Sequence, residues 1–235
     1  VLKNGVHYRV HIMPIISPPR REHINRWGIW RSLYEFLMIR LQRHCGLVFC
    51  AVITRPLRTS VPPLAENSGS EYRFLSEQEL IKFAKNSELQ IKPSVIKAAF
   101  AKGDTCTGAI NNGRLIAYLW RAYSPTKHTD GLWIDFGPQA RYSYDSFTLP
   151  QHRGQRVLTT LSLSTDTLDQ RGRKNSIAFI ETHNYSSLKN AEFSGNTIVG
   201  YAGYWHFFGK YYTFHSIGAK KEGFRFFAAE STTSA

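Results

Sequence analysis

The most informative segment of this 235-residue chain is Phe147-Thr148-Leu149-Pro150-Gln151-His152-Arg153-Gly154-Gln155-Arg156-Val157-Leu158. It reads as a short alternating strand, a proline, a basic turn and the start of a helix rich in Leu and Thr. The backbone N–H groups of such a turn and the first N–H groups of the helix converge on one place, where they bind a phosphate. Arg153 and Arg156 flank the turn with positive charge that suits a pyrophosphate. The segment therefore indicates a phosphate site, or else an ordinary loop with solvated arginines.

A second segment follows it, Ser176-Ile177-Ala178-Phe179-Ile180-Glu181-Thr182-His183-Asn184. Together the two segments resemble the GNAT acetyltransferase superfamily, whose members carry a V-x-P-x-x-R-G-x-G-x-G/A turn, a helix, a strand, and N-x-x-A/S opening a second helix that ends near a Gly. The matching positions are Thr148, Pro150, Arg153, Gly154, the helix from Val157 to about Gln170, Asn184, Ser187 and Gly195. The resemblance covers roughly two thirds of the chain, from about Tyr72 to Phe227.

The resemblance implies a mixed α/β fold, in which a mostly antiparallel twisted sheet is flanked by helices. It also implies an acyltransferase that moves an acetyl or other acyl group directly from acyl-CoA, as co-substrate, to an amine or hydroxyl acceptor. Backbone N–H groups in the strand would hold the thioester carbonyl, at Ser146, Phe147 and Thr148. The pyrophosphate would lie on the amides of Arg153, Gly154, Gln155, Arg156, Val157 and Leu158. Asn184, with Ser187 after it, would hold the pantetheine or its neighbouring loop.

Three positions depart from the family pattern. Arg156 and Leu158 stand where members have the later glycines of the turn, and Ala191 stands where many have a tyrosine acid. An arginine can still offer its backbone N–H if its φ is negative, but a position that requires a positive φ would be strained. The alternative to an enzyme is a binding module on the same scaffold that holds nucleic acid or an anionic surface.

Four residues are candidates for the general base. They are Asp145 in the strand before the turn, His152 in the turn, and Glu181 and His183 in the next strand. Because Glu181 and His183 are two residues apart on a strand, they share a face and make a plausible relay pair. Alternatively, Glu181 pairs with one of the many arginines and His183 is a satisfied strand-end histidine. The proton for the departing thiolate has several candidate sources, namely Tyr185, a residue of 201–214, or water.

Composition narrows the class of protein. The chain is 42% hydrophobic and 14% aromatic, which is enough for a folded core and argues against disorder. The formal net charge of +13 suits anionic partners, among them CoA phosphates, nucleic acid, lipopolysaccharide and an anionic membrane face. The net charge alone does not distinguish among these partners, and a peripheral contact with an anionic membrane remains one of the alternatives.

Cysteines and histidines give further expectations. Three cysteines, an odd number, form no disulfide framework, so we expect a reducing, cytoplasmic setting. The histidines never fall into a metal-binding spacing, and we expect no metal site. The most apolar run, residues 24–41, is interrupted by Arg26, Arg31, Glu35 and Arg40, which argues against a transmembrane helix.

The chain divides into three parts. Residues 1–60 form a strand–helix–strand extension, residues 61–70 are a linker rich in Pro, Ser, Asn and Gly, and residues 71–235 form the GNAT-like domain. In the extension we expect a strand at 6–12, a helix at 24–44 that Gly46 ends, and a buried strand at 47–54.

Two aromatic patterns have two interpretations each. One recurs along the helix at Trp27, Trp30, Tyr34, Leu37 and Leu41. We expect it to pack on a sheet, although a basic helix of this kind could also lie on an anionic membrane. The other is the aromatic run 201–214, which predicts twisted antiparallel strands. We expect its rings to pack in the core or on a sheet face, the alternative being a base-stacking platform.

The domain itself has clear local signals. Ser76 and Glu79 form a capping box at the start of a helix, and Asn112-Gly113 is a strong hairpin turn. The remaining elements that we expect are strands at 72–75, 104–110, 114–123, 131–136 and 141–149, and a helix at 94–101 with Pro93 in its first turn.

Overall fold

The computed structural model describes residues 20–60, 69–168 and 171–228. Its helices are α1 (Arg20–Trp27), α2 (Ile29–Cys45), α3 (Glu77–Phe83), α4 (Pro93–Ala101), α5 (Val157–Ser164), α6 (Tyr185–Phe193) and α7 (Ile217–Lys221), with 3-10 turns η2 (Ser87–Leu89) and η3 (Pro150–His152). Its strands are β1 (Leu47–Pro56), β2 (Glu71–Leu75), β3 (Thr105–Asn111), β4 (Arg114–Ala122), β5 (Thr126–Thr129), β6 (Leu132–Asp135), β7 (Ala140–Thr148), β8 (Asn175–Glu181), β9 (Thr197–Phe207), β10 (Lys210–His215) and β11 (Arg225–Ala228).

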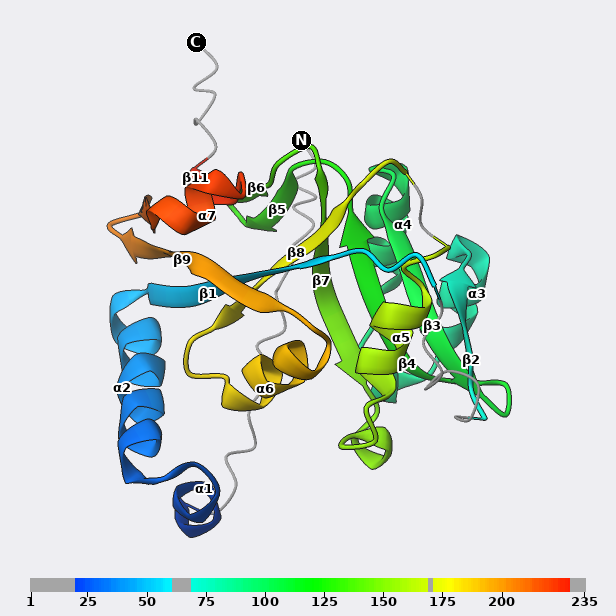
Figure 1. The fold of residues 1–235 in the computed structure, drawn as a ribbon, viewed down its shortest axis with the longest axis horizontal. Helices are drawn as coiled ribbons and strands as arrows, with labels where there is room; N and C mark the ends of the chain where they lie inside the picture. Colours follow the sequence, from blue (N-terminus) through cyan, green and yellow to red (C-terminus); the bar gives the residue numbers. More distant parts are fainter. Residues whose placement is uncertain (1–19, 61–68, 169–170, 229–235) are drawn as a thin grey trace, which may run out of the picture.

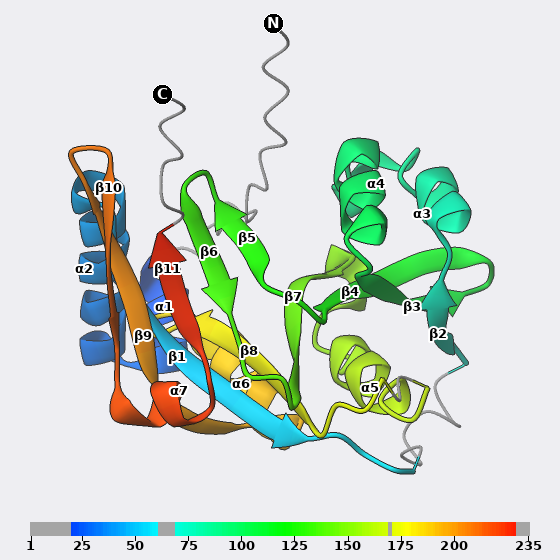
Figure 2. The same cartoon turned by 90° about the horizontal axis from the view of Figure 1, so that it is seen from above.

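These strands form two sheets. The large sheet has the order β10-β9-β1-β8-β7-β4-β3-β2, and the small one has the order β11-β6-β5 (Figure 1). Every pair in the large sheet is antiparallel except β7 with β8. Figure 2 places α5 on one side of the large sheet, and α3, α4 and the small sheet on the other. The predicted fold class, a mostly antiparallel sheet flanked by helices, is confirmed.

The N-terminal part contributes a strand to the middle of the large sheet. β1 lies between β8 and β9, and Ala51 is paired with Ile180 on one side and with Tyr201 on the other. Its central residues are buried, as the continuous apolar run predicts. The strand expected at 6–12, and most of the linker at 61–70, lie outside the described residues.

The predicted helix at 24–44 is two helices. Gly28, with φ 85°, separates α1 from α2, because that backbone conformation interrupts a helix and suits glycine. α2 ends at Gly46, whose φ of 65° gives the expected left-handed cap.

Local signals in the domain are confirmed. The Ser76 Oγ accepts a hydrogen bond from the Glu79 backbone N–H at 3.3 Å, and the Glu79 carboxylate accepts one from the Ser76 backbone N–H at 2.9 Å. The Asn112-Gly113 turn joins β3 to β4. By contrast, α5 ends at Ser164, short of the predicted 170, and β5, α7 and β11 were not predicted.

Packing of the two aromatic patterns is only partly as expected. On α2, Met38 is buried, but Trp30 has 80% of its surface exposed. On the β9–β10 hairpin, Tyr204 packs against His128, whereas Trp205 and Tyr212 are exposed on the opposite face. The expectation that these rings and side chains pack on a sheet or in the core is therefore wrong for Trp30 and Leu37 of the helix and for most of the aromatic residues of 201–214.

A buried charge cluster joins β1 to the end of α5. The Asp166 carboxylate accepts hydrogen bonds from Arg55, at 3.0 Å from its Nη2, and from Arg141. Arg121 donates to the Thr165 carbonyl at 3.1 Å and lies 3.9 Å from the same carboxylate. Since all four charged side chains are fully or almost fully buried, this network ties the N-terminal strand to the rest of the domain.

Candidate functional site

The two parallel strands β7 and β8 part in the middle of the sheet. Their pairing covers Ala140–Tyr142 and Asn175–Ile177, and it stops there among the described residues. Beyond this point β7 continues along β4 to Thr148, and β8 continues along β1 to Glu181 (Figure 1). The facing edges of β7 and β8 therefore have backbone groups that another extended chain can pair with.

A β-bulge lies in β7 just past that point. Tyr118 is paired with Phe147 and Trp120 with Tyr144, so two residues of β7, Asp145 and Ser146, stand opposite one residue of β4. Asp145 has a φ of 42°, and both bulge residues are exposed. Such a bulge turns backbone groups out of the regular ladder.

The turn after β7 contains two residues with left-handed backbone. Gly154 has a φ of 77° and Arg156 one of 58°, and both residues are exposed. Arg156 precedes α5, and its side chain does not cap the helix. A ligand could therefore accept hydrogen bonds from the first N–H groups of α5, at the positive end of the helix dipole. Arg156, which stands where the GNAT pattern has a glycine, thus has a positive φ, and this backbone conformation is strained for a residue that carries a Cβ.

The side chains around this turn have partners within the protein. The Arg153 Nε donates to the Thr148 carbonyl at 3.1 Å. The Arg156 guanidinium lies 5.0 Å from the centre of the Phe193 ring, and the Lys189 ammonium lies 5.9 Å from it. Phe193 is 56% exposed at the end of α6, so an exposed ring with two cations stands beside the turn.

The remaining predicted cofactor residues offer backbone atoms more than side chains. Phe147 is buried and stacks on Tyr118, Val157 is buried, and Leu158 packs against the core. Ser146 and Gln155 are exposed, and the Gln155 side chain donates to the Gln151 carbonyl at 3.2 Å.

Asn184 caps helix α6. Its side-chain carbonyl accepts hydrogen bonds from the Ser187 backbone N–H and from the Ser186 hydroxyl, each at 3.1 Å. The family-like spacing between Asn184 and Ser187 therefore has a local structural use in this chain, which fixes the start of the helix that follows β8.

Glu181 and His183 are in contact, although β8 ends at Glu181 and His183 lies in the turn after it, not on the strand face that we expected. The His183 Nε2 lies 3.1 Å from the Glu181 carboxylate. His183 is 5% exposed, and its Nδ1 is buried with no hydrogen-bond partner among the described residues. Asp145 lies on β7 and Glu181 on β8, so each of the two parting strands carries one of the candidate bases.

Helix α2 supplies side chains to this site that sequence reasoning missed. The Gln42 amide donates to the second Glu181 oxygen at 3.2 Å, and the Tyr34 hydroxyl shares a hydrogen bond of 2.7 Å with Thr182. Tyr34, Met38 and Gln42 recur every four residues, and this spacing was the available signal for one inward face.

The other expected residues of the reaction lie elsewhere. Ala191 is buried in α6 and carries no acidic group. The Tyr185 hydroxyl donates to the Arg31 carbonyl at 3.1 Å, and partial burial raises the pKa of Tyr185. His152 lies in η3 beside the turn. Among the described residues no three His, Cys, Asp or Glu side chains come together as a metal site.

Comparisons with known proteins yield matches of fold. No protein-family model and no curated protein matches the chain. A candidate GNAT acetyltransferase from Novosphingobium aromaticivorans is 16% identical with a TM-score of 0.44, covering 65% of this chain and 60% of that one. A GNAT-family acetyltransferase from Colwellia psychrerythraea is 13% identical (TM-score 0.43; 64% and 52% covered). YncA, a candidate acetyltransferase from Salmonella typhimurium solved with acetyl-CoA, is 14% identical (TM-score 0.40; 71% and 98% covered).

This chain spans about 60% of the length of the Novosphingobium protein that it matches. The names of these matched proteins are those of GNAT-family acetyltransferases. A likeness at this level concerns the fold and carries nothing about activity or substrate.

Proposed function

We propose that this chain is an acyltransferase that moves an acetyl or other acyl group directly from acyl-CoA to an amine or hydroxyl acceptor. The observation that carries the proposal is the parting of β7 from β8 at Tyr142 and Ile177, next to the bulge at Asp145. An acyl-CoA needs a slot for an extended arm, a donor for a carbonyl and a cradle for a pyrophosphate. The gap between the parted strands would take the extended arm, the bulge would provide the donor for the carbonyl, and the turn before α5 would hold the pyrophosphate.

The turn would hold the pyrophosphate through backbone N–H groups from Gly154 to Leu158. Left-handed residues at Gly154 and Arg156 are typical of nests in which successive N–H groups face an anion. The positive end of α5 and the charges of Arg153 and Arg156 strengthen the attraction. Beyond the turn, the exposed Phe193 ring with Arg156 and Lys189 nearby suits the adenine and phosphate of the nucleotide end.

The parted strands would hold the pantetheine arm. The arm carries two amides, which can pair with the free edge of β7 as an additional strand does. Backbone N–H groups at Ser146, Phe147 and Thr148 lie at or just after the bulge, where one of them would polarise the thioester carbonyl. The carbonyl oxygen gains negative charge during attack, so a fixed N–H donor stabilises the transition state more than the ground state.

Glu181 is our first candidate for the general base, with His183 as its relay partner and Asp145 as the second candidate. The base accepts a proton from the acceptor nitrogen or oxygen as that atom bonds to the carbonyl carbon. The C–S bond then breaks and the CoA thiolate takes up a proton, from solvent or from the protonated base. Gln42 holds one Glu181 oxygen, which would keep the carboxylate oriented for this step.

A binding module on the same scaffold is the second candidate function. Arg156 in place of glycine and the net charge of +13 favour it, because both suit a polyanion held without chemistry. Affinity for a nucleic acid would fall by orders of magnitude between low and moderate salt, whereas affinity for a pocketed acyl-CoA would fall far less.

Two broader expectations belong to the same proposal. The division into an extension at 1–60, a linker at 61–70 and a domain at 71–235 stays a prediction, although β1 pairs within the large sheet. Cys45, Cys50 and Cys106 are free thiols, as a reducing cytoplasmic setting would have them. No helix among the described residues has the length and apolar character needed to cross a bilayer.

The test is an acyl-transfer assay with a matched pair of glycine variants. The chain is incubated with acetyl-CoA and a panel of amine and hydroxyl acceptors, and CoA release and acetylated products are measured together. Gly154→Val and Gly172→Val both force a branched side chain into a positive φ in open space, but only Gly154 belongs to the turn. We expect transfer by the wild type and by Gly172→Val, and its loss in Gly154→Val. Equal transfer by all three, or no CoA release from the folded wild type with any acceptor class, would contradict the proposal.

A further inference from the structure

One end of the molecule has an extensive exposed apolar surface, which we name the apolar end. It consists of the outer face of α2 and one face of the β9–β10 hairpin. On α2 its members are Ile29, Trp30, Leu33, Phe36 and Leu37, and on the hairpin they are Tyr201, Trp205, Phe207, Phe208, Tyr212 and Phe214. Trp30 is 80% exposed and Phe208, at the hairpin tip, is 87% exposed. Monomeric proteins rarely leave so many large apolar side chains in water unless the surface binds something.

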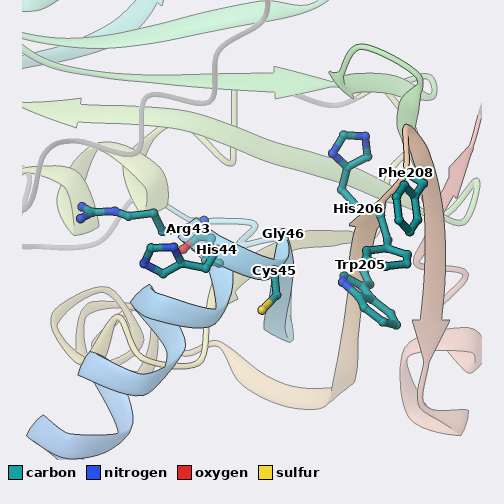
Figure 3. A pocket seen from close by; sticks show the side chains of 9 residues that line it. Arg43, His44, Cys45, Gly46, Trp205, His206 and Phe208 are labelled. Atoms are coloured by element: carbon teal, nitrogen blue, oxygen red, sulfur yellow. The ribbon is translucent and has the colours of Figure 1, made fainter.

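The two parts of this surface are adjacent. The His206 backbone N–H donates to the Gly46 carbonyl at 3.1 Å, which attaches the hairpin to the end of α2. A pocket of about 460 Å³ lies at this junction, and Figure 3 shows Arg43, His44 and Cys45 from the helix across from the aromatic residues of the hairpin. Figures 1 and 2 place α2 at one end of the molecule, and Figure 2 shows the hairpin beside it.

The charge around the apolar end has one sign. Residues 29–46 and 197–215 contain one acidic residue, Glu35, which is half-buried. The same stretches contain four cations, Arg31, Arg40, Arg43 and Lys210, all of them exposed. The Arg40 guanidinium lies 4.8 Å from the centre of the Phe36 ring, so the long stem of the arginine covers part of the apolar face while its head stays at the rim.

We propose that the apolar end docks on the surface of an anionic lipid bilayer. A helix lying in the plane of the interface needs an apolar face directed at the acyl chains and cations at its rim for the lipid phosphates, and α2 has both. Trp, Tyr and Arg are the side chains that favour the boundary between headgroups and hydrocarbon. The exposed Phe207 and Phe208 at the hairpin tip would add a second point of insertion beside the helix.

The charge pattern argues against two other occupants. A second copy of the chain, bound through the same surface, would bring cations such as Arg40 and Arg43 against a surface whose exposed charges are also positive. A nucleic acid would satisfy the arginines but leave aliphatic residues such as Ile29, Leu33 and Leu37 in water, since phosphates and sugars offer them nothing. A bilayer with anionic headgroups satisfies both kinds of side chain.

Flotation with lipid vesicles tests the apolar part of the proposal. Vesicles of phosphatidylcholine are compared with vesicles that contain about 30% phosphatidylserine, because anionic lipid supplies the surface potential. The full-length wild type should float with the anionic vesicles and not with the neutral ones. Trp30→Glu and Phe208→Glu should abolish flotation, since both place a carboxylate at the interface. Ile217→Glu is the matched control, because Ile217 is an apolar side chain on α7 with 76% exposure, and it should float like the wild type.

A second pair of variants separates docking at this surface from general attraction of a basic protein. Arg40→Gln with Arg43→Gln removes two cations from the rim, and Lys92→Gln with Lys97→Gln removes two exposed cations from the α4 region. At ~1 kcal/mol for each cation near the surface, the first pair should lower the partition coefficient about thirtyfold, and the second should hardly change it. An equal loss in both pairs would overturn the proposal.

Three further outcomes would overturn it. One is equal flotation with neutral and anionic vesicles. Another is a wild-type dimer in sedimentation velocity that Trp30→Glu dissociates, in a chain that does not float. The third is binding of single-stranded RNA that Trp30→Glu and Phe208→Glu abolish in the absence of flotation. Circular dichroism spectra of each variant identify loss of fold, and the Ile217→Glu control shows whether an added carboxylate alone prevents flotation.

Discussion

The Glu181 carboxylate lies 3.1 Å from the His183 Nε2, and Gln42 of the N-terminal part donates to its other oxygen at 3.2 Å. The carboxylate thus has one partner in the turn that follows β8 and another on α2. This arrangement connects the candidate base to a segment that the sequence resemblance does not include. It also means that the base is oriented before any ligand arrives, which is what a proton-transfer group requires.

Removal of the Glu181 charge should slow transfer. We expect Glu181→Gln to lower kcat by about a hundredfold or more, because the amide cannot accept the acceptor proton, while it still accepts the Gln42 hydrogen bond through its carbonyl. Glu192→Gln is the control, since Glu192 is an exposed carboxylate on α6. The measurement is steady-state kinetics alongside acetyl-CoA affinity. An unchanged kcat in Glu181→Gln would move the base to Asp145.

The left-handed backbone at Arg156 should cost stability. Glycine tolerates a φ of 58° without the contact that Cβ makes with the carbonyl, whereas alanine retains that contact. Both variants lose the contact with Phe193, so the comparison isolates the backbone strain. We therefore expect the free energy of unfolding, measured with urea, to be about 1 kcal/mol larger for Arg156→Gly than for Arg156→Ala. Equal stability of the two variants would mean that the positive φ is not populated in solution.

A chain without the N-terminal part should not fold. Residues 71–235 alone lack β1, which would leave the facing edges of β8 and β9 unpaired in the middle of the sheet. They also lack Arg55, one of the arginines that pair with the buried Asp166 carboxylate, so the buried cluster keeps Arg141 and Arg121 but loses one of its charge partners, which costs stability. We expect no cooperative thermal transition by circular dichroism for 71–235, and a cooperative one for the full chain. A cooperative transition of the shorter chain would contradict the structural role of β1.

Stability should fall in mild acid because of His128. Burial lowers the pKa of this histidine to about 4, below its usual value of about 6.5, and Tyr204 lies 3.0 Å from its Nε2. Between these two pH values the unfolded chain binds a proton at His128 that the folded chain does not bind. The free energy of unfolding is therefore unaffected by His128 above pH ~6.5, and it decreases as the pH falls toward 4. Between those values the loss is about 3 kcal/mol.

The same prediction has a matched pair of variants. Urea midpoints measured from pH 7 to pH 4 should lose most of this slope in His128→Gln, which cannot be protonated, and keep it in His44→Gln, because His44 is exposed. A slope that persists in His128→Gln would assign the effect to another group.

Local features of the fold could be predicted from the sequence, because their partners lie within a few residues. The Ser76 and Glu79 capping box, the Asn112-Gly113 hairpin and the Gly46 cap are all of this kind. The place of β1 between β8 and β9 could not be predicted, because its partners lie more than a hundred residues away. An apolar run indicates a buried strand but does not specify which strands it pairs with.

The candidate site divides in the same way. The contact between Glu181 and His183 is confirmed, but the two-residue period of a strand does not explain it, because β8 ends at Glu181 and His183 lies in the turn that follows. The role of Gln42 depends on how α2 lies against β8, which no local pattern contains. Alternating aromatics indicate a strand face without saying whether the face is covered, so the exposure of Trp205 and Tyr212 could be known only from the structure.

Titration calorimetry with acetyl-CoA tests the central claim most directly. We predict saturable binding of one acetyl-CoA per chain at moderate salt by the wild type and by Lys97→Glu, which reverses an exposed charge away from the turn. In Arg153→Glu, which puts a negative charge beside the pyrophosphate cradle, we predict binding at least about tenfold weaker. A folded wild type that does not bind acetyl-CoA, or binding that Arg153→Glu leaves unchanged, would contradict the acyl-CoA site at the turn before α5.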